Sequence, residues 1–384
     1  MRSCDCYLAY FGRRLVRLRK ILSGTSLALI LTGCLQPSDE ITSVTLDPLS
    51  DQATTVARSL SLTPLPPWPE GDQHGMANTL GPGSWLRCAR HLAQEGALVY
   101  ELSHLRSNDM PQSPWVAPER YEYLPTIGRP GSIDASNLGE LVIGGPGAQG
   151  TQMDAFGHWG YLAEPWDGAG EFPAADATYY GGFKQAEVKP SPDSPLLKLG
   201  IDQVPPIVTS AVLLDARTYV GGGQPMQAGQ LVTAADIERM IEAQGLAWRG
   251  LRPGDVLYIY TGWGEYWNEE FYYDMGPGLS YDAARYLEDK RIVLVALDNP
   301  FTDAVNEGQF FDGVAPPEST PTKSSAPVHY HNLTQAGIHN IQNANLAEIA
   351  QDQVWTSCTI ILPLRVKGGS GSPVRPIAIG VPMG

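Results

Sequence analysis

The sequence predicts a single α/β domain built around a mixed β-sheet, and three observations lead to this fold class. Apolar residues make up 43% and charged residues 17% of the 384 residues, which is the balance of a folded globular chain. The 41 glycines and 32 prolines indicate many turns and long connections, which disfavours a helical bundle. Strand patterns and helix patterns alternate irregularly along the chain, as they do in mixed sheets.

The expected elements follow in order from residue 75. Short apolar runs predict strands at 97–102, 211–215, 255–260, 292–297, 359–364 and 376–379. Helix patterns predict helices at 85–94, 233–244, 280–290 and 346–352. Thr233 and Ser280 are placed to cap their helices, and Asp236 completes a shortened capping box with Thr233. The turn Arg252-Pro253-Gly254 leads into the strand at 255–260.

Residues 1–33 have the pattern of an export signal. Basic residues at 13–20 precede an apolar stretch at 21–32, which is shorter than the roughly 20 residues of a permanent membrane helix. The motif Leu31-Thr32-Gly33-Cys34 then resembles the lipobox of bacterial lipoproteins. We expect Cys34 to be lipidated and to anchor the protein in the cell envelope, in the outer membrane facing the periplasm. The alternative is a cleaved secretory peptide with an incidental cysteine.

The segment 34–74 is expected to be the lipidated N-terminus and a linker rich in Pro, Ser and Thr, followed by a hydrolase-like domain at 75–384. The formal net charge of −15 excludes a nucleic-acid-binding role, because phosphate neutralisation needs a basic face. After removal of the signal and lipidation of Cys34, two thiols remain, Cys88 and Cys358. The sequence leaves open whether they form a disulfide or stay as two separate buried thiols.

The segment Gly150–His158 carries the first candidate site. Gln152 and Asp154 share a face of an extended strand, and Asp154 and His158 share a face if the chain turns helical there. A strand-to-helix junction would therefore bring an amide, a carboxylate and an imidazole together, and these are ligands for a zinc- or manganese-type cation. The alternative is a capped helix start with a histidine satisfied in the core.

The motif His329-Tyr330-His331 is the second candidate. On a strand, both imidazoles would share a face, which suits metal binding or proton transfer. The alternative is a polar loop edge. Three aromatic residues, Trp263, Tyr266 and Trp267, could line a pocket for an aromatic substrate, or they could belong to the core.

Taken together, these segments resemble the cyclase family of metal-dependent hydrolases, which includes bacterial kynurenine formamidase and isatin hydrolase. The family signature His-x-Gly-Thr-His-x-Asp-x-Pro-x-His falls on residues 148–158, and further blocks match at 211–215, 253–257, 261–263, 297–299, 328–339 and 363–373. The resemblance runs from about residue 80 to 384 and is greatest to the large cyclase subfamily, where Gly-Thr-Gln-x-Asp is a common variant. It implies a swivelling β/β/α fold.

The chain departs from the signature at several positions. Ala148 and Gln152 replace histidines, Gln342 replaces a glutamate, and Phe156 replaces the proline. The first three changes affect metal ligation, and Phe156 affects the turn instead. The retained ligand positions are Asp154, His158 and His329.

The resemblance implies one divalent ion, zinc or manganese, because amides bind cations less strongly than imidazoles and carboxylates. We expect Asp154, Gln152 and His329 to hold it, together with His158 or Gln342.

The resemblance also implies an enzyme that cleaves an amide or a lactone of arylformamidase or isatin hydrolase type, with water activated by the metal as nucleophile. His158 is the first choice for the general base and acid, His331 is the second choice, and Asp303 is a weaker site candidate. The alternative is a non-catalytic protein that binds a small molecule on the same scaffold after losing part of the metal site. Family members commonly self-associate, so a homo-oligomer is expected.

Overall fold

The computed structural model describes residues 66–113, 120–131, 133–145, 150–320 and 323–383. The expected export signal at 1–33, the lipidated Cys34, the linker as far as residue 65, and Ala148 lie outside the described residues. Within the described part of the chain, no helix is both long enough and apolar enough to cross a membrane.

A nine-stranded mixed sheet forms the centre of the domain, with strand order β1-β13-β11-β5-β7-β9-β10-β4-β12. Strands β5, β7, β9 and β10 run parallel at its centre, and the flanking strands pair antiparallel on both sides. The strands are β1 (Leu98–Glu101), β4 (Gln152–Asp154), β5 (Ile207–Asp215), β7 (Val256–Tyr260), β9 (Leu294–Leu297), β10 (His339–Gln342), β11 (Thr356–Ile361), β12 (Gly371–Pro373) and β13 (Ile377–Gly380). Their aliphatic runs explain why the central strands are buried.

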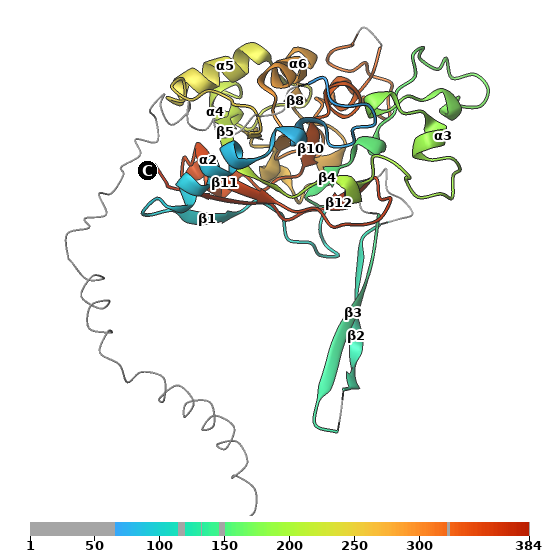
Figure 1. Ribbon diagram of the computed structural model, residues 1–384, viewed down its shortest axis with the longest axis horizontal. Helices are drawn as coiled ribbons and strands as arrows, with labels where there is room; N and C mark the ends of the chain where they lie inside the picture. The colour runs from blue at the N-terminus through green and yellow to red at the C-terminus, as the bar shows by residue number, and fades with distance from the viewer. Residues whose placement is uncertain (1–65, 114–119, 132, 146–149, 321–322, 384) are drawn as a thin grey trace, which may run out of the picture. The chain divides into compact units, whose positions relative to one another are not determined.

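The helices that pack on this sheet gather on its upper side in Figure 1, where α5 and α6 lie side by side and α2 rests on β5 and β11. The helices are α2 (Pro82–Leu92), α3 (Gln185–Val188), α4 (Ala216–Tyr219), α5 (Ala234–Ala243), α6 (Tyr281–Lys290), α7 (Pro327–Tyr330) and α8 (Ala347–Gln351). Short 3-10 turns occur at Gly75–Thr79, Phe156–His158 (η3), Ala174–Asp176, Tyr180–Gly182, Ile201–Gln203, Trp263–Tyr266 and Glu270–Tyr273, and a π-helical turn (η9) spans His331–Ala336.

The single α/β domain with a mixed sheet, predicted from the sequence, is confirmed. Each expected strand and helix has a counterpart within a few residues of the predicted range. The capping box at α5 is present, since the Thr233 hydroxyl accepts a hydrogen bond from the Asp236 amide and the Asp236 carboxylate accepts one from the Thr233 amide. The Ser280 hydroxyl caps α6 by accepting from the Ala283 amide.

Two small sheets were not predicted. Strands β2 (Glu122–Pro130) and β3 (Ser136–Ile143) form an antiparallel hairpin with an irregular register between Thr126 and Arg129. Leucine and isoleucine side chains of β3 are exposed. Strands β6 (Leu231–Val232) and β8 (Gly278–Leu279) form a short parallel pair.

A disulfide joins Cys88 on α2 to Cys358 on β11, across 270 residues of chain. The structure therefore settles the alternative that the sequence left open for these thiols. It also shows packing that begins before residue 75. Trp68 packs against the core, the Asp72 carboxylate accepts a hydrogen bond from the Tyr180 hydroxyl at 3.1 Å, and the Gln73 side-chain carbonyl accepts one from the Leu199 amide at 2.7 Å. The last part of the expected linker thus belongs to the folded body.

Candidate metal centre

The first half of the site is the predicted strand-to-helix junction. Gln152 and Asp154 lie on β4, which pairs with β10 and β12, and the extended Ala155 leads into the 3-10 turn that ends at His158. Gly157 permits this turn, because a Cβ atom there would meet the Leu199 carbonyl oxygen at 3.0 Å and a Leu196 methyl at 2.7 Å. The junction therefore delivers the carboxylate and the imidazole to one place.

Phe156, which stands at the proline position of the signature, packs beneath the site. Its ring stacks on His339 with 4.2 Å between centroids and contacts Tyr180 at 4.7 Å. The side chain is 1% exposed. This residue therefore supports the junction by packing and provides no ligand atom.

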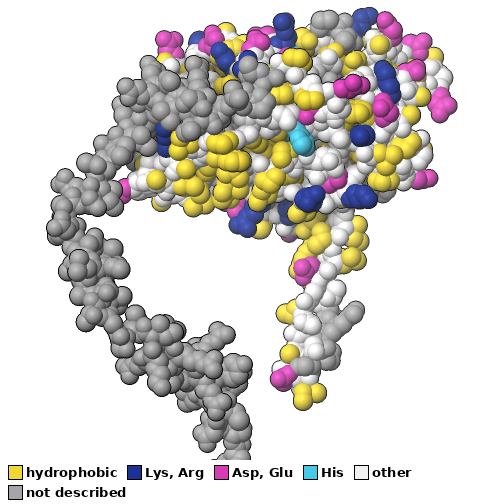
Figure 2. Space-filling model, viewed as in Figure 1, with side chains coloured by type: hydrophobic (Ala, Val, Ile, Leu, Met, Phe, Trp, Pro, Cys, Tyr) yellow, Lys and Arg dark blue, Asp and Glu magenta, His cyan; other side chains and the backbone are white. Residues whose placement is uncertain are grey.

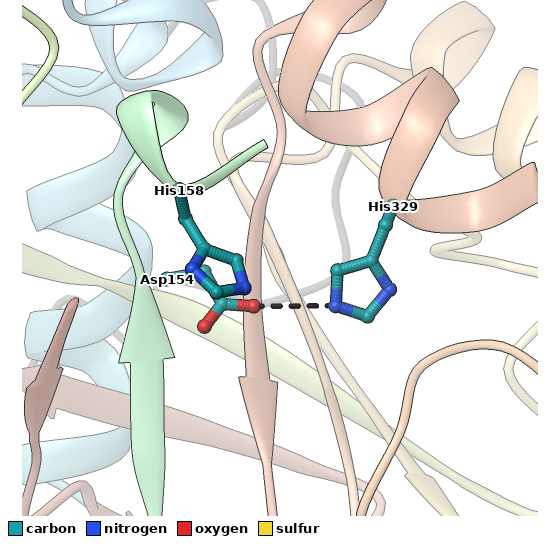
Figure 3. A group of neighbouring side chains, drawn as sticks. All are labelled: Asp154, His158 and His329. Carbon is teal, nitrogen blue, oxygen red and sulfur yellow. Dashed lines mark ion pairs between the residues drawn. The ribbon is translucent and has the colours of Figure 1, made fainter. Parts of the chain in front are cut away.

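Asp154, His158 and His329 form the cluster shown in Figure 3, with one ligand atom from each lying within 4.8 Å of the others. His329 arrives from α7, far along the chain, and its Nε2 atom is 3.4 Å from Asp154 Oδ2. Asp154 and His329 are buried, whereas His158 is exposed. The cluster thus combines a buried carboxylate–imidazole pair with one imidazole that solvent can reach.

Two glutamine side chains continue this network. The Gln342 amide nitrogen donates to Asp154 Oδ2 at 2.6 Å and lies 3.2 Å from His329 Nε2. The Gln152 amide nitrogen donates to Gln342 Oε1 at 3.1 Å. Gln152 Oε1 is buried and has no hydrogen-bond partner among the described residues.

Asp303 and Thr302 fix the other side of the His329 ring. Asp303 Oδ2 forms a short hydrogen bond with His329 Nδ1, and the Thr302 hydroxyl lies 3.1 Å from the same nitrogen. Burial by itself would lower the pKa of His329, but the Asp303 carboxylate and the hydrogen bond to Asp154 raise this pKa to about 10. The imidazole is therefore held between two carboxylates.

Asp154 is ionised for related reasons. Burial would raise the pKa of its carboxyl group, but the nearby His158 and the hydrogen bond with His329 lower this pKa below its usual range. A buried carboxylate with adjacent imidazole nitrogens is an established ligand set for divalent cations.

The side chains present fit such an ion. Asp154, His158 and His329 provide one oxygen and two nitrogen ligands, and the unpartnered Gln152 Oε1 is a further acceptor in the same network. Gln342 contributes a ligand only if its amide turns to present Oε1, because its nitrogen now faces Asp154. The Asp303–His329 contact has the form of the carboxylate–histidine pairs that orient metal-bound imidazoles.

The structure does not bring His331 to this cluster. A strand at 329–331 would have placed both imidazoles on one face, but the segment is helical: His329 lies in the last turn of the helix α7 and His331 begins the π-helical turn η9. His331 Nε2 lies 2.9 Å from Glu288 Oε2 on α6, and the ring meets Tyr281 edge to face.

The three predicted pocket aromatics lie in a separate cluster of rings. Trp263 and Trp267 are buried there with Tyr272 and Tyr273, and Tyr266 packs against them. The cluster approaches the metal centre through Asn343, the residue after Gln342, whose side-chain oxygen accepts a hydrogen bond from the Tyr272 hydroxyl at 3.0 Å. The ring contacts of His158 and His329 in the described part of the chain are with Trp159 and with each other, and they do not include these tryptophans.

Sequence reasoning did not single out Trp159 or Thr302. The centroids of the Trp159 and His329 rings are 5.3 Å apart. Trp159 directly follows His158 in the sequence. Its place next to the candidate ligand His158 is the sequence feature that could have identified it. Thr302 precedes Asp303, and no sequence pattern around Thr302 indicates that it belongs to the site.

Comparison with known proteins identifies the family to which this chain belongs. The family model described as putative cyclase matches residues 100–304. No curated protein matches the chain. A solved structure described as a novel cyclase is similar, with 24% identity and a TM-score of 0.65 over 81% of this chain and 95% of that one.

Two isatin hydrolase structures share the fold. One is bound to the product analogue thioisatinate and has 17% identity and a TM-score of 0.50, over 77% of this chain and 96% of that one. The other is isatin hydrolase A from Labrenzia aggregata bound to benzyl benzoate, with 18% identity and a TM-score of 0.50, over 76% of this chain and 97% of that one. Because the family model spans more than half of the chain, this protein belongs to the cyclase family.

Proposed function

We propose that this protein is a metal-dependent hydrolase that cleaves an amide or a lactone. The observation that carries the proposal is the convergence of Asp154, His158 and His329 within 4.8 Å, on a scaffold shared with isatin hydrolases. Zinc or manganese is the proposed ion, because the ligand set mixes one carboxylate with imidazoles and amide oxygens.

Asp154 and His329 would hold the ion, with Gln152 Oε1 as a neutral third ligand and His158 or Gln342 completing the set. A divalent cation held by these residues would supply Lewis acidity, which polarises a carbonyl group and makes water more acidic. Asp303 holds the His329 ring so that Nε2 faces Asp154. The Gln152–Gln342 hydrogen bond keeps the Asp154 carboxylate in its orientation.

His158 is the proposed general base and acid, in the arrangement in which Gln342 completes the ligand set and His158 stays free of the ion. It lies at the solvent-exposed side of the cluster, where it can exchange protons with water. In the proposed reaction, the water oxygen bonds to the acyl carbon while His158 takes the water's proton. The C–N or C–O bond of the substrate then breaks, and His158 gives the proton to the departing nitrogen or oxygen.

A second candidate is a binding protein that does not turn over its ligand. One observation favours it: the Gln342 amide donates directly to Asp154, so the carboxylate is partly satisfied by the protein itself. Gln342 also lacks the negative charge that a carboxylate would offer a cation, and Gln152 provides an amide where an imidazole would bind more strongly.

Metal content distinguishes the two candidates. We expect about one zinc or manganese per chain in the wild-type protein, and loss of that ion in Asp154→Asn and His329→Gln. The matched control is His331→Gln, because His331 pairs with Glu288 outside the cluster and its loss should leave the metal in place. The metal-loaded protein should hydrolyse members of an amide and lactone panel, and Asp154→Asn should not.

Absence of metal from the wild-type protein after incubation with zinc and with manganese would favour the binding protein. Retention of metal by Asp154→Asn would locate the ion elsewhere. Loss of metal from His331→Gln as well as from the cluster variants would indicate a general folding effect instead of ligation.

We also propose that the protein works in the cell envelope, attached through Cys34. The Cys88–Cys358 disulfide supports a compartment outside the cytoplasm, where such bonds persist. Metabolic labelling with a fatty acid, followed by fractionation of the wild-type protein and Cys34→Ala, tests this. Unlabelled wild-type protein would contradict lipidation.

A further inference from the structure

A groove with a volume of about 630 Å³ lies beside the ends of β1, β11 and β12. Its walls include the aliphatic side chains of Leu105, Leu362 and Leu364, which are 86%, 54% and 57% exposed. Figure 2 shows hydrophobic side chains gathered on the face of the molecule near β1. The volume falls within the roughly 300–1,000 Å³ of small-molecule sites. We call this feature the β11 groove.

The polar lining of the β11 groove includes Arg106 and His104, together with Ser103, Thr151 and the ion pair of Glu101 with Arg375. The Arg106 guanidinium lies over the Tyr121 ring, 4.5 Å from its centroid, and its Nε atom is buried without a hydrogen-bond partner among the described residues. No carboxylate in the described part of the chain forms an ion pair with it. By contrast, Arg375 at the same groove is paired with Glu101 at 2.7 Å.

Arg106 is half-buried and its buried Nε atom lacks a partner among the described residues, so a guanidinium partly removed from water is suited to an anion from outside the chain. Burial lowers the pKa of Arg106. The neighbouring group that raises this pKa is the phenol of Tyr121, not a carboxylate. The Arg106 stem passes close to Gly150, since a Cβ added at Gly150 would meet Arg106 Cγ at 3.6 Å.

His104 adds a neutral polar group next to this cation. Its ring stacks on Trp267 with 4.1 Å between centroids, and its backbone amide donates to the Thr151 hydroxyl at 2.9 Å. Its Nε2 atom is buried without a partner among the described residues. Burial lowers the pKa of His104 to about 4, so the imidazole is neutral at neutral pH. Because Arg375 is paired with Glu101, Arg106 is the cation of this groove that has no carboxylate partner among the described residues, and His104 is a neutral polar group beside it.

We propose that the β11 groove binds a monocarboxylate with an aliphatic chain, with the carboxylate at Arg106 and His104 and the chain along Leu105, Leu362 and Leu364. A guanidinium pairs with a carboxylate through two parallel hydrogen bonds, and a single charge matches a monoanion. The aliphatic walls recognise the chain by removing its apolar surface from water. This site is separate from the metal centre, which it approaches at the consecutive residues Thr151 and Gln152.

Calorimetric titration of the purified protein with octanoate tests the proposal. We expect saturable binding of one octanoate per chain, and binding of acetate and of uncharged 1-octanol that is weaker by about tenfold or more. Arg106→Gln should weaken octanoate binding by about tenfold to a hundredfold, and Arg106→Lys should retain part of it. The matched control is Arg375→Gln, which should bind octanoate within about twofold of the wild type, because Arg375 already pairs with Glu101.

The same titration on Asp154→Asn separates this proposal from the proposed hydrolase. Octanoate binding should be unchanged in Asp154→Asn, and metal content should be unchanged in Arg106→Gln. Loss of octanoate binding in Asp154→Asn would mean that the metal centre captures the carboxylate, and it would overturn the proposal. So would wild-type protein that shows no saturable binding, or an Arg106→Gln protein that binds as well as the wild type.

If Arg106→Gln does not fold, the exposed wall residue Leu364 provides a second variant. Leu364→Ser should weaken octanoate binding severalfold and leave acetate binding unchanged, since it removes chain contacts alone. Equal octanoate affinity in Leu364→Ser and the wild type would contradict a chain lying along this wall.

Discussion

Asp303 contacts His329 in two ways, through the ring and through the backbone. Its carboxylate bonds the Nδ1 atom of the imidazole and also accepts the amides of Val328 and His329 at the start of α7. One carboxylate therefore fixes both the helix start and the ring that faces Asp154. This explains how a ligand far from β4 in the chain is aligned with it.

Asp303→Asn should weaken zinc binding by about tenfold to a hundredfold, the usual cost of losing a residue that orients a metal-bound histidine. The measurement is competition of the protein with a zinc-binding dye. Asp312→Asn is a suitable control, because it makes the same chemical change at an exposed position in a turn. Equal zinc affinity in Asp303→Asn and the wild type would show that the contact does not orient the ligand.

Gln342→Glu should increase metal affinity. A carboxylate at this position would replace an amide that donates to Asp154 and would add a full negative charge next to His329. The free protein should be less stable at neutral pH, because two buried carboxylates repel each other until a cation binds. Thermal unfolding with and without zinc measures both effects. A variant that gains no more stability from zinc than the wild type would contradict the expected ligand position.

Removal of the disulfide should lower stability substantially. The double variant Cys88→Ser/Cys358→Ser opens a loop closed across 270 residues, and the chain-entropy treatment gives a loss on the order of 5 kcal/mol in the free energy of unfolding. Denaturant unfolding under non-reducing conditions measures it. Reduction of the wild-type protein should have a similar effect and should leave the double variant unchanged.

Protonation of two histidines should reduce the stability of the fold in mild acid, and Asp298, whose pKa burial raises to about 6, should oppose part of this loss. Burial, assisted by the charge of Arg249, lowers the pKa of His91 to about 4, and burial lowers that of His104 to about 4. As pH falls through 6.5, the unfolded chain takes up protons at these sites while the folded chain does not, so the stability that the two histidines contribute decreases between pH 6.5 and 4. The loss reaches on the order of 3 kcal/mol for each histidine. The free energy of unfolding of His91→Gln should depend less steeply on pH, and an unchanged slope would contradict this.

The sequence predicted the fold where the local pattern matches the structure. Strands such as β7 and β9 are uninterrupted apolar runs, and α5 and α6 begin with capping residues. Strand β10 reads His-Asn-Ile-Gln and lacks that pattern, because its side chains serve a polar site in the interior. The hairpin strand β2 contains proline and glycine, which disfavour a strand by local propensity.

The candidate site was predictable in part for similar reasons. The spacing of Gln152, Asp154 and His158 was sufficient to predict their convergence, since one strand and one turn position all three. The alternation in His329-Tyr330-His331 suggested a strand, but the segment is helical because Asp303, distant in sequence, accepts the amides at its start. Arg106 has no ion-pair partner among the described residues, which depends on the acids that the fold brings near, and local sequence does not contain that information.

The Cys88–Cys358 bond gives the molecule a ring-like covalent topology. Every candidate metal ligand, from Gln152 to Gln342, lies inside the closed segment. A protease that cuts one exposed connection within this segment would leave both fragments covalently attached through the disulfide. The two halves of the metal centre would then stay on one molecule after a single cut, and a second cut or a reductant would be needed to release them.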